Sequence, residues 1–301
     1  NLIERICIRG STQLTAGLLA KLGEKDIAVL VLQGLAKKPT LMLPSLRKDA
    51  KRRQIQYQLS QQRLFIISFV RELIRSKITA QCEHLIHLAQ AAQQFFLVEE
   101  LQMKKTLYLH RVNGAEEIER IRGIEGAMAN DYFQTLATFL PPSLNFSGRN
   151  KRPPKDPYNV ILSLGYTLLH AEWVRQSYLM GLDPYIGFFH QPTIGRESLA
   201  CDLMEPLRPH YDAFALKLFK EQILRVDHFT YKANACLLGK AGRLKFYEAF
   251  EVFLTEQQPL IQAQKRALFR MIFQYNREQN QSFSEEQEAL FEPAALEEQR
   301  I

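Results

Sequence analysis

The spacing of apolar residues changes once along this chain, near residue 60, and the change separates two kinds of architecture. Before it, residues 2–8, 27–32 and 41–43 are short apolar runs with the length and composition of strands. Residues 12–22 place leucines four positions apart, as on one face of a helix. The sequence therefore predicts a small sheet domain over residues 1–60.

After residue 63, apolar residues recur every three or four positions, which is typical of helices packed on a core. The expected fold class is α+β, with the sheet domain followed by a larger all-helical domain over residues 61–284. Residues 285–301 carry six glutamates and one arginine and are expected to form a disordered acidic tail. The predicted helices are marked by Leu64, Ile67, Ile74 and Ile78, by Ile118, Ile121, Tyr132 and Leu136, by Ile161, Leu164, Leu168 and Val174, and by the patterns over 212–227, 242–255 and 259–279.

The chain is basic, with 39 Lys and Arg residues against 32 Asp and Glu residues and a net charge of +7. Without residues 285–301 the balance is 38 − 26 = +12. A basic body favours a polyanionic partner, most simply nucleic acid, although many basic proteins bind none. Two basic segments, residues 47–53 and 148–155, are candidates for tracking a phosphate backbone, with a solvated linker as the alternative for the first. The candidate contacts in them are Arg52, Arg53, Lys151 and Arg152.

Membrane-spanning and disulfide-stapled proteins are excluded by two simple features. The longest apolar run, residues 27–32, has six residues, whereas a helix that crosses a bilayer needs roughly 20. The four cysteines are too widely spaced for a zinc knuckle or a dense disulfide framework. The sequence therefore predicts a soluble protein of a reducing compartment, the cytoplasm.

One predicted helix, near residues 115–137, has a carboxylate in its apolar stripe. Glu125 falls on the face that also carries Ile121. An unpaired carboxylate is costly to bury, so Glu125 must be protonated, paired with a base or bound to a cation. A salt bridge to an arginine of a neighbouring helix is the structural alternative. Gly123 and Gly126 flank Glu125 and would let another backbone approach closely.

A second group of polar residues follows residue 187. His190 comes directly after two phenylalanines, and Arg196 follows a glycine. Asp202 and Glu205 are three positions apart, so on a helix they share a face. Each has an ordinary explanation, because a histidine beside an apolar run is often a core residue and acidic residues are favoured near helix N-termini.

Together, Glu125, His190, Asp202 and Glu205 supply carboxylates and one imidazole among apolar residues of one basic domain. Such a donor set suits Mg²⁺ or Mn²⁺ better than a structural zinc ion, which more often recruits thiolates. A divalent ion in a basic setting is typical equipment for phosphodiester chemistry. The residues therefore predict a metal site for that chemistry.

At these residues the chain resembles the CRISPR-associated integrase family, the first of the Cas proteins. The resemblance implies that Glu125, His190 and Asp202 are the metal ligands and that Glu205 supports them from a neighbouring position. Arg196 is a candidate phosphate contact because of its charge and location. The resemblance is densest over residues 122–209 and is carried by the segments 122–127, 159–166, 181–190 and 195–205.

The resemblance also implies an activity and partners. The helical domain would be catalytic and would join the 3′-hydroxyl ends of captured double-stranded DNA to the CRISPR repeat by transesterification, with Mg²⁺ or Mn²⁺ as cofactor. The alternatives are a metal-dependent nuclease without an integrase function and a non-catalytic DNA-binding scaffold. Family members are homodimers that pair through the sheet domain, and a small ferredoxin-like adaptation protein bridges two dimers.

The start of the chain departs from the family pattern. Members begin with several strands ahead of the position equivalent to Leu2, so the sheet domain is expected to be incomplete here. Some members resemble fusions with an upstream reverse transcriptase. This chain is therefore interpreted as the integrase portion of such a fusion.

Overall fold

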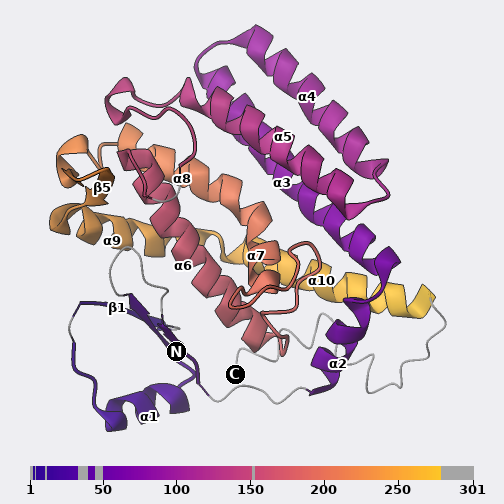
Figure 1. The fold of residues 1–301 in the computed structure, drawn as a ribbon. Helices are drawn as coiled ribbons and strands as arrows, with labels where there is room; N and C mark the ends of the chain where they lie inside the picture. The colour runs from indigo at the N-terminus through magenta and orange to yellow at the C-terminus, as the bar shows by residue number, and fades with distance from the viewer. Residues whose placement is uncertain are drawn as a thin grey trace. The chain divides into compact units, whose positions relative to one another are not determined.

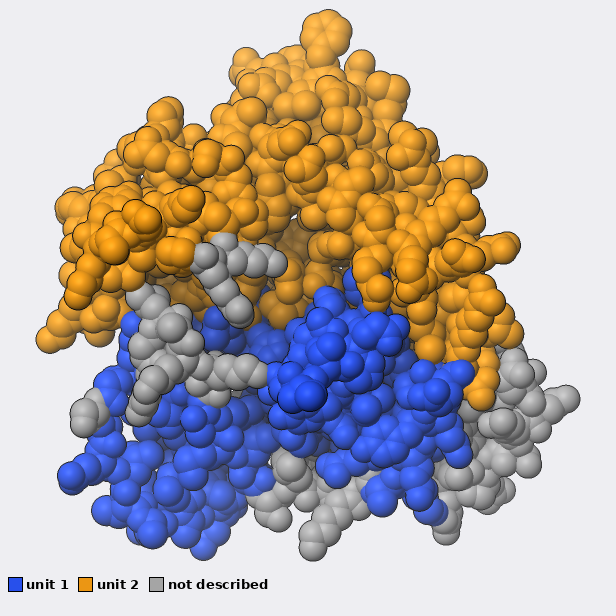
Figure 2. All heavy atoms as spheres, viewed as in Figure 1, with its two compact units in different colours: residues 1–61, 167–202 blue, residues 62–166, 203–301 orange. Residues whose placement is uncertain are grey.

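The computed structural model describes residues 3, 5–10, 12–32, 40–44, 50–150 and 153–278. They form two compact units (Figure 2): unit 1 comprises residues 1–61 and 167–202, and unit 2 comprises residues 62–166 and 203–301. The predicted acidic tail lies outside the described residues, as do Lys151 and Arg152.

Unit 1 is built on a three-stranded sheet in the order β1 (Arg5–Arg9), β2 (Ala28–Leu32), β3 (Thr40–Met42). Strands β1 and β2 are parallel, and β2 and β3 are antiparallel. Helix α1 (Ala16–Glu24) connects β1 to β2 and begins after Thr15, whose hydroxyl accepts from a main-chain N–H of the first turn. The three strands and the helix confirm the pattern predicted for this part of the chain.

Unit 1 also contains helix α2 (Ala50–Leu59), the second half of α6 (Pro157–Leu179) and most of α7 (Ser198–Met204). An Arg5 guanidinium nitrogen on β1 donates to Glu172 Oε2 of α6 at 2.7 Å, and Gln56 of α2 exchanges hydrogen bonds with main-chain atoms of Asp183. These contacts explain why residues 167–202 group with the sheet, whereas the sequence pattern assigned all of 61–284 to the second region.

Arg52 has a structural role rather than the predicted contact with DNA. Residues 50–59 are helical, so this half of the basic segment is not a linker. The Arg52 side chain is buried and donates to the main-chain oxygen of Met180 at 3.0 Å, both within unit 1. Burial of the guanidinium inside the unit corrects its assignment as a phosphate contact. Arg53 is half-buried on the same helix and stays a candidate.

Unit 2 is a helical body around α3 (Arg63–Ala91), which packs against α4 (Phe95–Asn113), α5 (Ile118–Ala137) and α8 (Arg208–Lys220) (Figure 1). The buried residues of α3 include Ile67, Ile74 and Ile78, as predicted. Leu64, predicted to share their face, is 68% exposed, and Phe65 beside it in the first turn is buried instead.

The C-terminal part of unit 2 contains a hairpin that the sequence pattern missed. The helix predicted over 212–227 ends at Lys220, and strands β4 (Phe229–Lys232) and β5 (Ala235–Leu238) follow. Helices α9 (Lys240–Glu256) and α10 (Gln258–Glu278) complete the described chain. A small sheet followed by helices confirms the α+β class. None of the described helices is long and apolar enough to cross a membrane.

Candidate metal and DNA site

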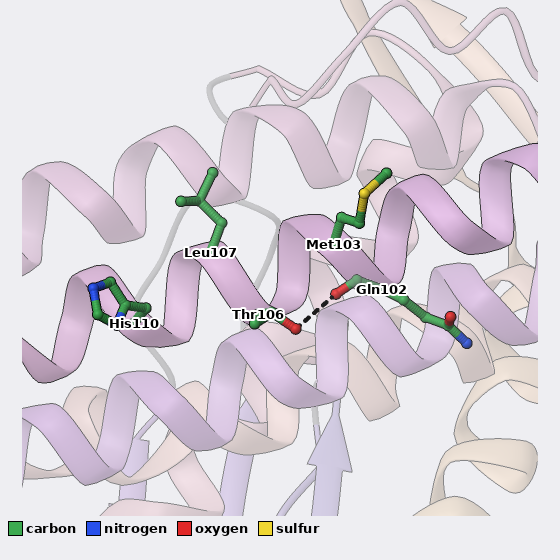
Figure 3. Close-up of a pocket in the computed structure, with 5 residues that line it drawn as sticks. All are labelled: Gln102, Met103, Thr106, Leu107 and His110. Carbon is green, nitrogen blue, oxygen red and sulfur yellow. Dashed lines mark hydrogen bonds between the residues drawn. The ribbon is translucent and has the colours of Figure 1, made fainter.

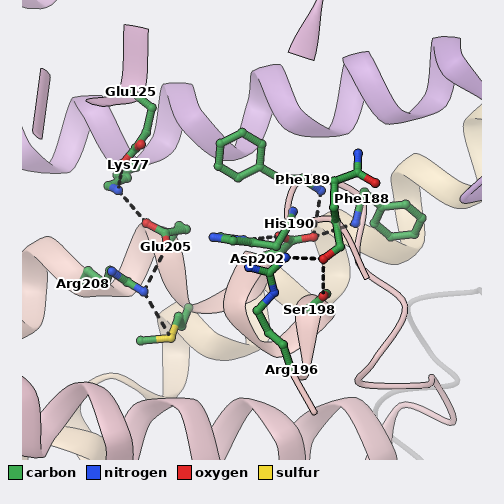
Figure 4. Close-up of polar contacts among 12 residues, drawn as sticks. Lys77, Glu125, Phe188, Phe189, His190, Arg196, Ser198, Asp202, Glu205 and Arg208 are labelled. Atoms are coloured by element: carbon green, nitrogen blue, oxygen red, sulfur yellow. Dashed lines mark hydrogen bonds and ion pairs between the residues drawn. The ribbon is translucent and has the colours of Figure 1, made fainter. Parts of the chain in front are cut away.

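In unit 2, one lysine bridges two acidic residues from different elements. Lys77 lies on α3, Glu125 on α5, and Glu205 on the short 3-10 helix Glu205–Leu207. The Lys77 ammonium donates to Glu205 Oε2 at 2.6 Å and also to Glu125 Oε1 (Figure 4). The exposed side-chain fractions are 7% for Lys77, 4% for Glu205 and 21% for Glu125. The two carboxylates therefore meet at one buried cation.

Glu205 has a second cationic partner. Pro206 cannot supply an N–H to continue α7, so the chain changes to a 3-10 turn at Glu205 before α8 begins at Arg208. The Arg208 guanidinium lies 3.2 Å from Glu205 Oε1. Burial alone lowers the pKa of Lys77, but the carboxylates of Glu205 and Glu125 outweigh that effect and raise the pKa above its ordinary value. Lys77 is therefore a charged ammonium in this cluster.

The surroundings of Glu125 differ from one expectation. Its pairing with Lys77 is the salt bridge given above as the structural alternative, with a lysine in place of an arginine. Gly123 and Gly126 were predicted to admit a neighbouring backbone. Apart from their own helix turn, no atom of the described chain lies within 4 Å of a Cβ added to either glycine, so that prediction is wrong. The glycines instead leave the surface of α5 beside Glu125 open.

In unit 1, the loop before α7 folds around the Asp202 carboxylate, which is 0% exposed. Asp202 Oδ2 accepts from the main-chain N–H groups of Phe188 and Phe189 at 2.7 and 3.0 Å. Asp202 Oδ1 accepts from the main-chain N–H of His190 at 2.9 Å and lies 2.7 Å from Nδ1 of its ring (Figure 4). A Cβ at Gly187 would lie 2.7 Å from Asp202 Oδ2, so this close approach requires glycine.

These contacts give Asp202 a definite function within unit 1. Both of its oxygens are engaged by the loop, and the contact of His190 Nδ1 with Oδ1 leaves Nε2 as the ring nitrogen that faces away from Asp202. Asp202 thus fixes the orientation of the His190 ring. The resemblance assigned Asp202 as a direct ligand and Glu205 as its support. In the structure it is Glu205 that shares a partner with Glu125.

The predicted ligand set is divided between the two units. Glu125 and Glu205 belong to unit 2, and His190 and Asp202 belong to unit 1. Among the described residues, no three His, Cys, Asp or Glu side chains are placed to hold a metal ion together. Each pair is assembled within its own unit, and the complete set stays a prediction.

Two arginines are held by hydrogen bonds within their own units: Arg196, a predicted phosphate contact, and Arg149, in the basic loop. Arg196 is half-buried, and its guanidinium donates to the main-chain oxygen of Gln191, which stabilises the loop after His190. Arg149, in the basic loop of unit 2, donates to Asn159 Oδ1 at 2.7 Å. Burial lowers the pKa of this guanidinium below its ordinary range.

A buried carboxylate joins α6 to α8 inside unit 2. The Tyr166 hydroxyl donates to Asp212 Oδ1 at 2.5 Å, and the Tyr158 hydroxyl donates to the main-chain oxygen of Asp212 at 3.0 Å. The Arg208 guanidinium lies over the Tyr166 ring, 4.8 Å from its centroid. Burial raises the pKa of Asp212 to about 6, although the Tyr166 hydrogen bond and the nearby arginines Arg149 and Arg208 act in the opposite direction.

The raised pKa of Asp212 predicts a pH-dependent stability. Because its pKa is higher in the folded chain than in the unfolded chain, its protonated form stabilises the fold below about pH 4, and this contribution is lost as the pH rises to about 6. The variant Asp212→Asn cannot ionise. We expect the free energy of unfolding of Asp212→Asn, relative to that of wild type, to rise by about 2 to 3 kcal/mol as the pH increases from about 4 to about 7. Urea denaturation of both proteins at each pH measures this difference, and a difference that does not vary with pH would contradict the prediction.

A groove on α4 is lined by none of the predicted site residues (Figure 3). All of its lining residues come from that helix, and the Thr106 hydroxyl donates to the main-chain oxygen of Gln102 at 3.1 Å. Met103 and Leu107 are 67% and 46% exposed. The groove is an apolar helix surface rather than part of the polar site. Its lining residues are Gln102, Met103, Thr106, Leu107 and His110.

The family model of the CRISPR associated protein Cas1 matches residues 1–252. The chain belongs to the Cas1 family. The CRISPR-associated endonuclease Cas1 1 of Thermodesulfovibrio yellowstonii is 37% identical over 288 residues, which cover 90% of this chain and 86% of that protein. The family predicted from the sequence motifs is therefore confirmed.

Solved structures agree with the Cas1 assignment. A Cas1 protein from Thermotoga maritima has the same fold, with a TM-score of 0.75 at 21% identity over 89% of this chain and 84% of that one. A casposase bound to integration product gives a TM-score of 0.73 at 25% identity over 84% of this chain and 70% of the casposase. A chain of a Cas6-RT-Cas1–Cas2 complex gives 0.70 at 25% identity, over 82% of this chain and 28% of that one.

Sequence reasoning missed Lys77, the residue at the centre of the Cas1 carboxylate pair. A signal was present, because Lys77 is three positions after Ile74 and therefore on the buried face of α3. A lysine that interrupts an apolar stripe is as anomalous as Glu125, and the two together would have indicated a buried ion pair.

Proposed function

We propose that this Cas1 chain is a metal-dependent DNA integrase of CRISPR adaptation, which joins 3′-hydroxyl ends of captured DNA to the CRISPR repeat by transesterification. The observation that carries the proposal is the convergence of Glu125 and Glu205 on one buried cationic atom. The likeness to a casposase bound to integration product supports an integration reaction over simple DNA binding.

The donor chemistry fits Mg²⁺ or Mn²⁺. The carboxylates of Glu125 and Glu205 come from different elements and both contact one positive charge, that of Lys77. Carboxylate oxygens are preferred ligands of both ions. We propose Glu125, Glu205 and His190 Nε2 as the ligands, with Asp202 holding the imidazole. When bound, a dication polarises a phosphoryl oxygen and neutralises charge on the attacking and leaving oxygens.

The remaining work of the protein is positioning. His190 is held through both its main chain and its ring by Asp202, so little reorganisation of the imidazole is needed during the reaction. Arg208 neutralises Glu205 and is itself fixed over the Tyr166 ring. Arg196 and Arg53 remain the candidate phosphate contacts among the described residues, and Lys151 and Arg152 are candidates outside them.

The proposed partners follow from the family and its relatives. We propose double-stranded DNA as substrate, a homodimer that pairs through the sheet domain, and a small ferredoxin-like adaptation protein that bridges two dimers. One structural relative is a chain of a Cas6-RT-Cas1–Cas2 complex. The match covers 28% of that longer chain. It supports the proposal that this chain is the integrase portion of a reverse transcriptase fusion. We also propose a cytoplasmic location, which the wide spacing of the four cysteines favours.

The test is a joining assay with the full chain, Mn²⁺ and a labelled duplex fragment whose ends carry 3′-hydroxyls. We expect the label to appear in a longer product that contains the repeat. A matched fragment with 3′-dideoxy ends lacks the nucleophile and should give no joined product.

A second candidate function, that of a nuclease, is supported by the likeness to the CRISPR-associated endonuclease Cas1 1 of Thermodesulfovibrio yellowstonii. Attack by water at the same site would give hydrolysis. Products that are only shortened, from both kinds of fragment, would favour that nuclease over the integrase. No reaction in any divalent metal would favour a DNA-binding scaffold.

A further inference from the structure

Lys77 contacts both acidic residues of the candidate site in unit 2. Its ammonium donates to Glu125 and to Glu205 while its side chain is only 7% exposed. A buried lysine with two carboxylate partners is held by directed, charge-assisted hydrogen bonds rather than by loose surface pairing. Its place between the carboxylates is also the place that a shared cation would take.

We propose that Lys77 is an internal counter-ion, which holds Glu125 and Glu205 together in the metal-free protein and is displaced from them by the divalent metal. This inference rests on the proposed metal site and adds a competitor to it. The competition weakens the apparent affinity for metal, because a dication binds only if its interactions with the two carboxylates are stronger than the two charge-assisted hydrogen bonds that it replaces.

The charge balance of the cluster supports displacement over co-occupancy. Without a metal, Glu125 and Glu205 carry two negative charges, and Lys77 and Arg208 carry two positive charges. A dication added beside both cations would leave the cluster with two excess positive charges in a largely buried place. Withdrawal of the Lys77 ammonium from the carboxylates removes one of these charges and frees the oxygens that a metal needs.

The experiment compares metal affinity of the full chain with that of Lys77→Met, which keeps a long unbranched side chain but has no charge. Mn²⁺ is the probe, and free Mn²⁺ is followed by electron paramagnetic resonance. We expect the apparent dissociation constant of Lys77→Met to fall by about tenfold or more, because no charge-assisted hydrogen bonds must be broken. Lys105→Met is the matched control, since Lys105 pairs with Glu83 at 2.8 Å on other helical surfaces of unit 2.

A second measurement keeps the inference testable if Lys77→Met does not fold. In the wild-type chain, amine labelling followed by mass spectrometry reports the accessibility of Lys77. We expect saturating Mn²⁺ to increase labelling of Lys77 and to leave labelling of Lys105 unchanged. Labelling of Lys77 that Mn²⁺ does not increase would show that the ammonium stays on its carboxylates.

The outcomes separate this inference from the proposed function. If wild type and Lys105→Met bind Mn²⁺ equally and Lys77→Met binds equally or more weakly, Lys77 is not a competitor, and the metal-dependent integrase stands. If the wild-type chain binds no Mn²⁺ at all, both fail. Tighter binding by Lys77→Met alone supports the inference.

Discussion

Replacing Glu125 by glutamine is expected to reduce strand joining by about a thousandfold or more and to leave DNA affinity unchanged. Glutamine keeps the shape of the side chain and can still accept a hydrogen bond from Lys77, so unit 2 should remain folded. What it removes is one of the two negative charges that meet in the cluster.

The size of the effect follows from the function of a metal ligand. A bound dication contributes several kcal/mol of charge stabilisation to phosphoryl transfer, and each 1.36 kcal/mol is a tenfold change in rate. A loss of about 4 kcal/mol therefore corresponds to about a thousandfold. DNA affinity depends on phosphate contacts by basic side chains, none of which this substitution alters.

The matched control for Glu125→Gln is Glu119→Gln on the same helix. The Glu119 side chain is 75% exposed and lies 3.7 Å from Arg122, one turn along α5, so its loss should change neither rate nor affinity measurably. Single-turnover joining in Mn²⁺ and fluorescence anisotropy with the same duplex give the two readouts. Near wild-type joining by Glu125→Gln would remove Glu125 from the ligand set.

The sequence could identify Glu125 as a candidate site residue because the helical periodicity places this charged residue on an apolar face. A carboxylate in an apolar stripe needs a partner, and the structure places the Lys77 ammonium there. The partner itself could not be identified, because helical periodicity shows which residues face inward but not which helix they face. The same limit applies to Glu172, whose carboxylate binds Arg5 from a distant strand and Arg175 from its own helix.

The roles of Asp202 and Glu205 show a second limit. Their spacing of three positions predicts a shared helix face, but the helix changes to a 3-10 turn at Glu205 because of Pro206. Asp202 meets main-chain N–H groups of a loop that comes a dozen positions earlier. Motif position alone cannot distinguish a carboxylate that binds a cation from one that caps a loop, since both are buried and both follow the histidine in the same stretch of sequence.

The set of residues that belongs to unit 1 is also determined by contacts between residues that are far apart in the sequence. The change of period near residue 60 coincides with the end of the first segment of unit 1. Residues 167–202 join that unit through side chains such as Gln56, whose amide nitrogen donates to the main-chain oxygens of Asp183 and Ile186 at 2.9 and 2.7 Å. A glutamine in a polar helix carries no sequence signal that it will bind a loop 127 positions away.

Replacing Asp202 by alanine is expected to destabilise the metal-free protein by about 4 kcal/mol or more. Three main-chain N–H groups, those of Phe188, Phe189 and His190, would lose their acceptor, and each unsatisfied buried group costs about 1 to 3 kcal/mol. Urea denaturation with a chelator present measures the loss. Hydrogen exchange of the amides at 188–190 should accelerate in the same variant, because those three groups would no longer be protected.

This prediction separates two functions for one carboxylate. If Asp202 served only as a metal ligand, its removal from the metal-free protein would relieve charge repulsion and would not lower stability. Asp227→Ala is the control, because Asp227 forms an exposed pair with Arg225 and its loss should change stability by less than about 0.5 kcal/mol. An Asp202→Ala protein that is as stable as wild type in chelator but no longer binds Mn²⁺ would restore Asp202 as a ligand and would leave the orientation of His190 without an explanation.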